Sequence, residues 1–227
     1  MTHLIDTGVD AIKIFAASPV QLGKVVVMPS EIAKAVCSAV HARGKLVFAH
    51  PTTISGIRVA LASGVDIIAH TTPDENETWN KALIDQMLVS NLHVIPTIKL
   101  WKWEAERMKL PSKVKEQFIN KAIEQLSAFH NAGGKTLFGT DIDYKDDYDP
   151  TDEYVFMSNA GMNFKAILTS LTLTPAEKFN SSSQTGKLEP GMDADIVVLN
   201  GDPEKDIKNL AKVKYTLRKG KIIYGEW

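Results

Sequence analysis

One stretch of the chain, residues 45–72, constrains the fold more than any other. It contains two short apolar runs, and these end on His50 and His70. Apolar residues at helical spacing lie between the two runs, and Gly64 closes that segment. A strand, a helix, a glycine and a second strand predict a βαβ unit, with parallel strands and a right-handed crossover.

Both histidines are expected at the carboxyl ends of neighbouring parallel strands, where α/β folds build their sites. Imidazoles on adjacent strand ends are close enough to share a metal ion. A single histidine at a strand end is more often a hydrogen-bonded structural residue than a ligand. Two histidines in equivalent positions of one unit leave the structural and the metal-binding interpretations open.

Strands and helices alternate through most of the remaining sequence. The pattern predicts a loop at residues 18–28, and the other predicted elements follow. Further strands are expected at residues 9–16, 92–97 and 135–140, and helices at residues 29–43, 79–90, 98–111, 112–131, 151–160, 163–171 and 175–180. Lys13 interrupts the first apolar run, either as a solvent-facing residue of an edge strand or as a chemically used lysine.

Five strand ends then follow one another along the chain. They carry Lys13, His50, His70, a Pro-Thr tip at residues 96–97, and Asp141. This order predicts an α/β fold that forms most of a parallel barrel. Lysine, histidine, histidine and aspartate at successive strand ends are a ligand set for a divalent ion such as Zn²⁺. The lysine can join only if its amine is modified, because an ammonium group repels a cation.

The pattern of residue types in the sequence changes after Gly186. Short alternating strands are separated by glycine and aspartate turns, and residues 218–221 have the composition of a hairpin turn. We therefore expect two domains, a partial barrel at residues 1–185 and a small β element at residues 186–227.

Composition excludes several classes of function. The net charge of −1 and the pI of about 6.6 predict no basic surface for nucleic acid. No apolar run approaches the length of a membrane span, and the first residues do not resemble a signal peptide. Cys37 is the single cysteine, which fits a reducing compartment. These features predict a cytoplasmic protein that binds neither membranes nor nucleic acid.

An ordered series of segments gives the chain a specific resemblance. The segments read GVDAIKIF, VFAHP, GVDIIAHTTP, GTD, LTLTPAEKF and GKLEPGMDADIVVLNGDP. In this order and spacing they resemble the carboxyl-terminal half of an amidohydrolase-superfamily enzyme. The group most similar is imidazolonepropionase-like or Xaa-Pro dipeptidase-like.

The resemblance implies a binuclear metal site. The lysine matching Lys13 is carboxylated by CO₂ in that family and bridges two metal ions, and zinc is the expected metal. The residues matching His50 and His70 bind one ion, and the residue matching Asp141 binds the other and moves protons. Thr53 stands where mononuclear deaminases of the superfamily have glutamate, which favours a hydrolase over a deaminase.

The resemblance also implies a fold and a reaction. The fold is part of a TIM-like (β/α)8 barrel, with strands 4–8 of the family, followed by the carboxyl-terminal part of a small β-sandwich. The reaction is hydrolysis of C–N bonds in small-molecule amides, cyclic amides or dipeptides by a metal-activated hydroxide. Residues that follow the strand ends are expected to face the substrate. They are Ser18, Thr71, Asp143 and Tyr144.

The sequence departs from the family in one large respect. It contains no His-x-His pair, and its first residues correspond to the helix before the fourth barrel strand. We therefore expect a fragment that is weak or inactive alone, and that forms a homo-oligomer or is complemented by an amino-terminal half. The alternative is a catalytically silent fragment that serves as an assembly or interaction module.

Overall fold

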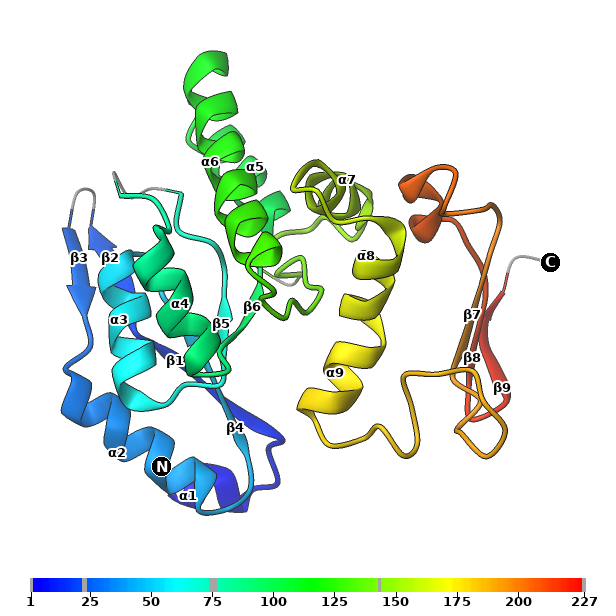
Figure 1. Ribbon diagram of the computed structural model, residues 1–227, viewed down its shortest axis with the longest axis horizontal. Coiled ribbons are helices and arrows are strands. Elements are labelled where there is room, and N and C mark those ends of the chain that lie inside the picture. Colours follow the sequence, from blue (N-terminus) through cyan, green and yellow to red (C-terminus); the bar gives the residue numbers. More distant parts are fainter. Residues whose placement is uncertain (1, 22–23, 74–76, 143, 226–227) are drawn as a thin grey trace. The chain divides into compact units, whose positions relative to one another are not determined.

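A computed structural model describes residues 2–21, 24–73, 77–142 and 144–225 of the chain. The chain divides into two compact units, residues 1–136 and 137–227. Figure 1 shows the elements of both units in sequence colours. The domain boundary expected between residues 185 and 186 stays a prediction.

The first unit is an α/β structure whose helices alternate with parallel strands. Its helices are α1 (Thr2–Asp6), α2 (Ser30–His41), α3 (Ile54–Ser63), α4 (Lys81–Val89), α5 (Ile98–Arg107) and α6 (Ser112–Asn131). Its strands are β1 (Ala11–Phe15), β2 (Ala17–Gln21), β3 (Lys24–Val27), β4 (Leu46–His50), β5 (Ile67–Ala69) and β6 (His93–Ile95). The predicted α/β class with a parallel sheet is confirmed.

The parallel sheet has the strand order β1-β4-β5-β6. The βαβ unit predicted at residues 45–72 forms β4, α3 and β5 of this sheet. Helix α3 begins where the Thr53 hydroxyl accepts a hydrogen bond from the Gly56 amide, and it ends at Gly64, whose φ is 79°. In the register of β1 and β4, Phe15 lies opposite His50.

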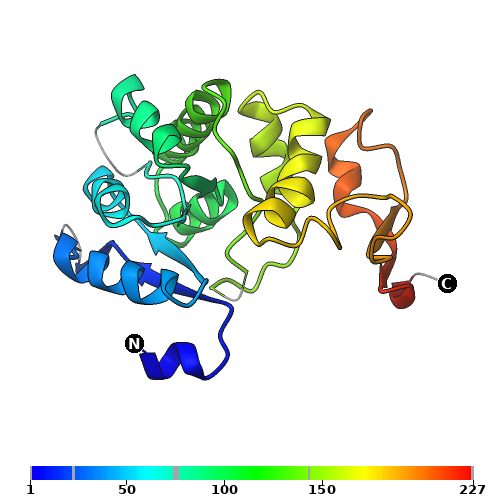
Figure 2. The same cartoon turned by 60° about the horizontal axis from the view of Figure 1, so that its bottom comes forward.

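Helices α2, α3 and α4 cover one face of the parallel sheet (Figures 1 and 2). Ile12 and Ile14 of β1 point into this core and are buried. The alternate residues, Lys13 and Phe15, lie on the opposite face, where the Phe15 side chain is 55% exposed. Since β1 is an edge strand, both interpretations of Lys13 remain compatible with its position.

Two sequence predictions in this unit are wrong. Residues 18–28 were expected to be a loop, but β2 and β3 form an antiparallel hairpin there. All four residues of β3 are exposed, so the hairpin lacks the alternation by which strands are recognised. Residues 135–140 were expected to be a strand, but among the described residues only a parallel bridge between Val94 and Thr136 forms.

In its described residues, the second unit combines helices with a small antiparallel sheet. Its elements are α7 (Thr151–Asn159), α8 (Phe164–Leu171), α9 (Leu173–Lys178), β7 (Ile196–Leu199), the 3-10 helix η1 (Ile207–Ala211), β8 (Val213–Arg218) and β9 (Lys221–Gly225). Helix α9 begins two residues before the start expected at Pro175. The predicted hairpin turn joins β8 to β9, with positive φ at Lys219 and Gly220. The β-sandwich itself stays a prediction.

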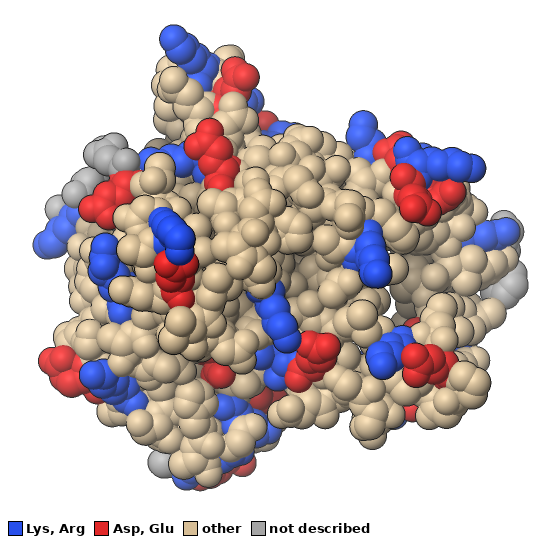
Figure 3. Space-filling view, in the orientation of Figure 1, with Lys and Arg blue, Asp and Glu red and all other residues tan. Residues whose placement is uncertain are grey.

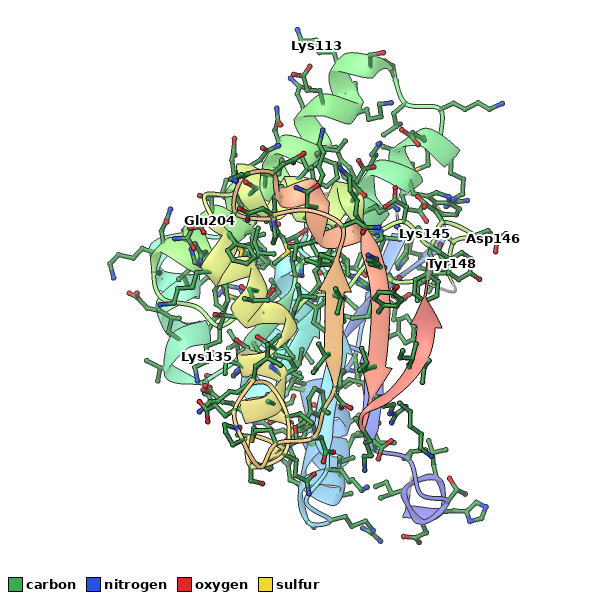
Figure 4. All side chains as sticks on the ribbon, turned by 90° about the vertical axis from the view of Figure 1, so that its right-hand side faces the viewer. Lys113, Lys135, Lys145, Asp146, Tyr148 and Glu204 are labelled. Atoms are coloured by element: carbon green, nitrogen blue, oxygen red, sulfur yellow. The ribbon has the colours of Figure 1, made fainter. Side chains whose placement is uncertain are left out.

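The surface carries charges of both signs. Lysines and arginines alternate with aspartates and glutamates over the face seen in Figure 3. In the loop before α7, Asp146 and Tyr148 are exposed and project outward, whereas Lys145 is buried (Figure 4). Within the described part of the chain, no helix is both long enough and apolar enough to cross a membrane.

Candidate metal centre

His50 and His70 lie side by side at the carboxyl edge of the parallel sheet. His50 is the last residue of β4, and His70 directly follows β5. Their ring centroids are 4.7 Å apart, and the rings meet edge to face at 73°. The structure therefore brings together the two imidazoles that the βαβ pattern placed at neighbouring strand ends.

The His70 side chain is held rigidly in the interior. It is 1% exposed, and its backbone amide donates to the Ile95 carbonyl at 2.9 Å. Its Nδ1 lies 2.5 Å from the hydroxyl of Thr97, which donates to the Pro96 carbonyl at 2.9 Å. Its Nε2 is buried and has no hydrogen-bond partner among the described residues. A buried polar atom without a partner is costly, so it calls for a ligand or another explanation.

Both imidazoles are held in their neutral form at pH 7. Burial, together with the charge of Lys13, lowers the pKa of His50 to about 4. Burial also lowers the pKa of His70 well below its ordinary value, with smaller contributions from His50 and Lys13. Neutral imidazole is the form that binds metal ions, so this environment prepares both side chains as ligands.

Lys13 lies near the histidine pair, but it is farther from the carboxyl end of its strand than the position opposite His50. In the register of β1 and β4 it is opposite Phe48, while Phe15 is opposite His50. Its positive charge acts on both imidazoles. As an ammonium group it would repel a cation, so a role as ligand requires modification of the amine.

Aromatic rings flank the two imidazoles. The Phe15 ring lies 5.1 Å from the ring of His50, and the Trp101 ring lies 6.0 Å from that of His70. The Trp101 indole donates to the Thr71 hydroxyl at 2.9 Å, which fixes the indole beside the strand ends. These neighbours make the surroundings of the pair largely apolar.

Three of the residues expected to face substrate have described positions. Ser18 is a partly exposed residue of β2, opposite Val26 in the hairpin. Thr71 is fully buried, and its hydroxyl accepts the hydrogen bond of the Trp101 indole. Tyr144 is 57% exposed in the second unit, and Asp143 lies outside the described residues. Their contacts with substrate stay predictions.

Asp141 belongs to the second unit, where it directly follows residues 135–140. Its φ is 55°, a left-handed conformation that aspartate adopts more readily than most residues. Its role as a metal ligand and proton carrier stays a prediction.

The histidine pair fits a divalent metal ion as part of a ligand set. Two neutral imidazoles and a buried Nε2 without a hydrogen-bond partner are donors that zinc accepts. Across the described residues, no group of three or more His, Cys, Asp or Glu side chains is gathered for a metal. The pair would account for two ligands, and catalytic zinc usually has three from protein.

Sequence reasoning did not identify Thr97 as a partner of His70. The two residues are 27 positions apart and meet only because β5 pairs with β6. The available signal was the position of Thr97 at the tip of the next strand.

Comparison with known protein families shows to which family this chain belongs. A model described as the amidohydrolase family matches residues 3–223. The chain belongs to the amidohydrolase family. A comparison with curated proteins gave no match. The family resemblance inferred from the segments around Lys13, His50, His70 and Asp141 is thereby confirmed.

Several solved structures share the fold of this chain. A Xaa-Pro dipeptidase with methionine bound in its active site superposes with a TM-score of 0.84 at 27% identity, over 97% of this chain and 56% of that one. A prolidase complexed with N-methylphosphonate-L-proline gives 0.78 at 25% identity, over 98% and 56%. Ochratoxinase from A. niger gives 0.80 at 20% identity, over 97% and 52%, and shows the fold alone. The amidohydrolase-family chain spans about half the length of these structures.

Proposed function

We propose that this chain forms part of the active site of a metal-dependent hydrolase that cleaves C–N bonds. The observation that carries the proposal is the buried Nε2 of His70, which has no hydrogen-bond partner among the described residues and belongs to a ring 4.7 Å from that of His50. Membership of the amidohydrolase family supports the same reaction class.

In this proposal, His50 and His70 hold one divalent ion, with zinc as the expected metal. Their neutral imidazoles offer lone pairs at pH 7. Lys13 joins the site after carboxylation, in which its neutral amine attacks CO₂, forms an N–C bond and releases a proton. The product is an anionic carbamate, which attracts a cation where an ammonium group repels it.

A bound divalent metal would supply a water nucleophile at neutral pH and would polarise the scissile carbonyl. Asp141 would accept a proton from that water and pass it to the leaving nitrogen. Phe15 and Trp101, which flank the imidazoles, would limit access of bulk water to the pair.

The proposed substrates are small amides, cyclic amides and dipeptides. The similarity to a Xaa-Pro dipeptidase and to a prolidase complexed with N-methylphosphonate-L-proline supports this choice. Ser18, Thr71, Asp143 and Tyr144 are the proposed substrate-facing residues.

A complete site needs more ligands than the histidine pair supplies. We therefore propose that a complementing polypeptide or a second copy of the chain contributes to the assembled enzyme. Turnover by the 227-residue chain alone should remain below about 1 s⁻¹, under ordinary enzyme values. Residues 186–227 are proposed to form part of a small β-sandwich.

Metal binding and hydrolysis test this proposal together. The chain is loaded with Zn²⁺, Mn²⁺ or Co²⁺, its metal content is measured after dialysis, and Xaa-Pro dipeptides and N-acyl amino acids are assayed. His50→Ala and His70→Ala should each remove most of the bound metal. The matched control is His41→Ala, because His41 bonds to Asp66, which precedes β5 at the opposite edge of the sheet.

Metal retention in His41→Ala and metal loss in both other variants would support the assignment. Equal metal content in all variants would show that the pair is not a metal site. Hydrolysis that appears only after a complementing segment is added would support shared assembly of the site. Unchanged turnover in His50→Ala and His70→Ala would contradict the proposed chemistry.

A further inference from the structure

Thr97 combines three unusual properties. It is 2% exposed, it is β-branched, and its φ of 47° lies in the left-handed region. A β-branched residue with positive φ is a genuine outlier, and such conformations cost of order 1–3 kcal/mol each. Glycine or asparagine would adopt this backbone at lower cost. The threonine at this position therefore calls for a reason beyond local conformation.

The hydroxyl of Thr97 provides that reason. It lies 2.9 Å from the Pro96 carbonyl and 2.5 Å from Nδ1 of His70. A hydroxyl has one hydrogen to donate and two lone pairs with which to accept. Because the Pro96 carbonyl can only accept, its contact with Thr97 uses the hydroxyl hydrogen. The contact with His70 is then satisfied only if Nδ1 carries a hydrogen and donates it to the hydroxyl oxygen.

The opposite tautomer would lose one hydrogen bond on the Nδ1 side of the His70 ring. With its hydrogen on Nε2, the ring would bury an N–H donor that has no partner among the described residues. Nδ1 would then compete with the Pro96 carbonyl for the single hydroxyl hydrogen. Either tautomer leaves Nε2 without a partner among the described residues, at a cost of about 1–3 kcal/mol, so the hydrogen bonds at Nδ1 decide between the tautomers.

We propose that Thr97 is a positioning residue that fixes His70 in the Nδ1–H tautomer, so that the Nε2 lone pair is available to a divalent metal. The tautomer assignment follows from hydrogen-bond geometry alone, and its consequence for metal affinity rests on the proposed function. Thr97 acts through His70 and touches neither metal nor substrate in this proposal. Partners of this kind orient the ligand, and their loss typically lowers metal affinity 10–100-fold.

The chain offers a matched control for Thr97. Thr52 is also a buried threonine with positive φ, 49°, and its hydroxyl donates to the Ala17 carbonyl at 2.8 Å. Thr97→Val and Thr52→Val each remove one buried hydroxyl from a left-handed threonine. Only the first change removes a partner of His70. Thr97→Ser keeps the hydroxyl and serves as the conservative rescue.

The experiment measures the tautomer directly. Long-range ¹H–¹⁵N spectra of the full chain with ¹⁵N-labelled histidine are recorded at pH 7 without metal, and His70→Ala identifies the His70 signals. We expect the Nδ1–H pattern for His70 in the parent chain, in Thr97→Ser and in Thr52→Val. Thr97→Val should shift His70 towards the Nε2–H form or a mixture. Circular dichroism of each variant verifies that it is folded.

Zinc titration of the same samples gives the second readout. Thr97→Val should weaken zinc binding 10–100-fold, while Thr97→Ser and Thr52→Val should stay within about threefold of the parent chain. An Nε2–H pattern in the parent chain, or an unchanged tautomer in folded Thr97→Val, would overturn the inference. If the predicted changes of tautomer are observed but the chain binds no zinc, the role of Thr97 would be supported and the proposed function would be refuted.

Discussion

Histidines occur at both the amino edge and the carboxyl edge of the parallel sheet, which are formed by the two ends of its strands, and they differ in their hydrogen bonding. At the amino edge, His41 bonds to Asp66 at 2.8 Å, and His93 Nδ1 bonds to the Asn91 carbonyl at 3.0 Å. At the carboxyl edge, the buried Nε2 of His70 lacks a hydrogen-bond partner among the described residues, and the His70 ring lies beside that of His50. The comparison separates histidines whose ring nitrogens are bonded within the sheet from the histidine pair that we propose as a metal site.

Backbone conformation follows the same division. At the amino edge, positive φ occurs at residues that accept it easily, Gly64 and Asn91. At the carboxyl edge it occurs at Thr52, His70 and Thr97. Strained backbone that persists at one edge only indicates that the surrounding structure maintains it there, as it commonly does at functional sites.

The largest effect is expected from Gly56→Ala. A Cβ at this position would collide with the Pro51 carbonyl and would lie 2.9 Å from the Ala17 side chain. Because Pro51 directly follows His50, relief of the clash must move the carboxyl edge. We expect a loss of about 3 kcal/mol in the free energy of unfolding, measured in urea, together with weaker metal binding. Parent-like zinc affinity in the destabilised variant would show that the edge tolerates such movement.

Asp66→Ala should produce a smaller loss at the amino edge. The Asp66 carboxylate accepts from the Val47 amide at 2.8 Å, and its removal leaves that buried amide without this partner. We expect a loss of about 2 kcal/mol in urea denaturation, with zinc affinity unchanged. Asp66→Asn, which keeps an acceptor oxygen, should recover part of the loss. A parallel fall in zinc affinity would mean that the two edges are not independent.

The pH dependence of the free energy of unfolding should arise at the carboxyl edge of the sheet, where His50 lies. With its pKa lowered from 6.5 to about 4, His50 binds fewer protons when folded than when unfolded between these values. Its contribution to stability is therefore complete above about pH 6.5 and is lost as the pH falls towards 4. Urea denaturation across this range should show a smaller slope for His50→Gln than for the control His41→Gln. Equal slopes would contradict the burial of His50 as the cause.

The smallest effect on stability is expected from Phe15→Ala. The side chain is 55% exposed, so truncation should cost less than about 1 kcal/mol in urea. Its ring lies 5.1 Å from that of His50, so its loss should admit water to the pair. We expect the pKa of His50, followed by NMR titration, to rise towards its ordinary value. An unchanged pKa would assign the lowering to other neighbours.

The sequence predicted the parts of this structure that depend on local periodicity. The βαβ unit and the histidines at its strand ends follow from apolar spacing, and α6 occupies the predicted residues 112–131. The hairpin at residues 17–27 was missed because its valines are exposed, although three consecutive β-branched residues were a signal. The role of Thr97 was not predictable, because its left-handed backbone and its contact with His70 arise from tertiary structure.

X-ray absorption at the zinc edge tests the central claim most directly. In the zinc-loaded chain, the account predicts imidazole nitrogen scatterers at about 2.0–2.1 Å, with the outer-shell pattern of two histidines. His70→Ala should remove one imidazole from this pattern, and His41→Ala should leave it unchanged. A zinc shell without imidazole, or a shell that His41→Ala alters and His70→Ala does not, would contradict the assignment of the carboxyl edge as the metal centre.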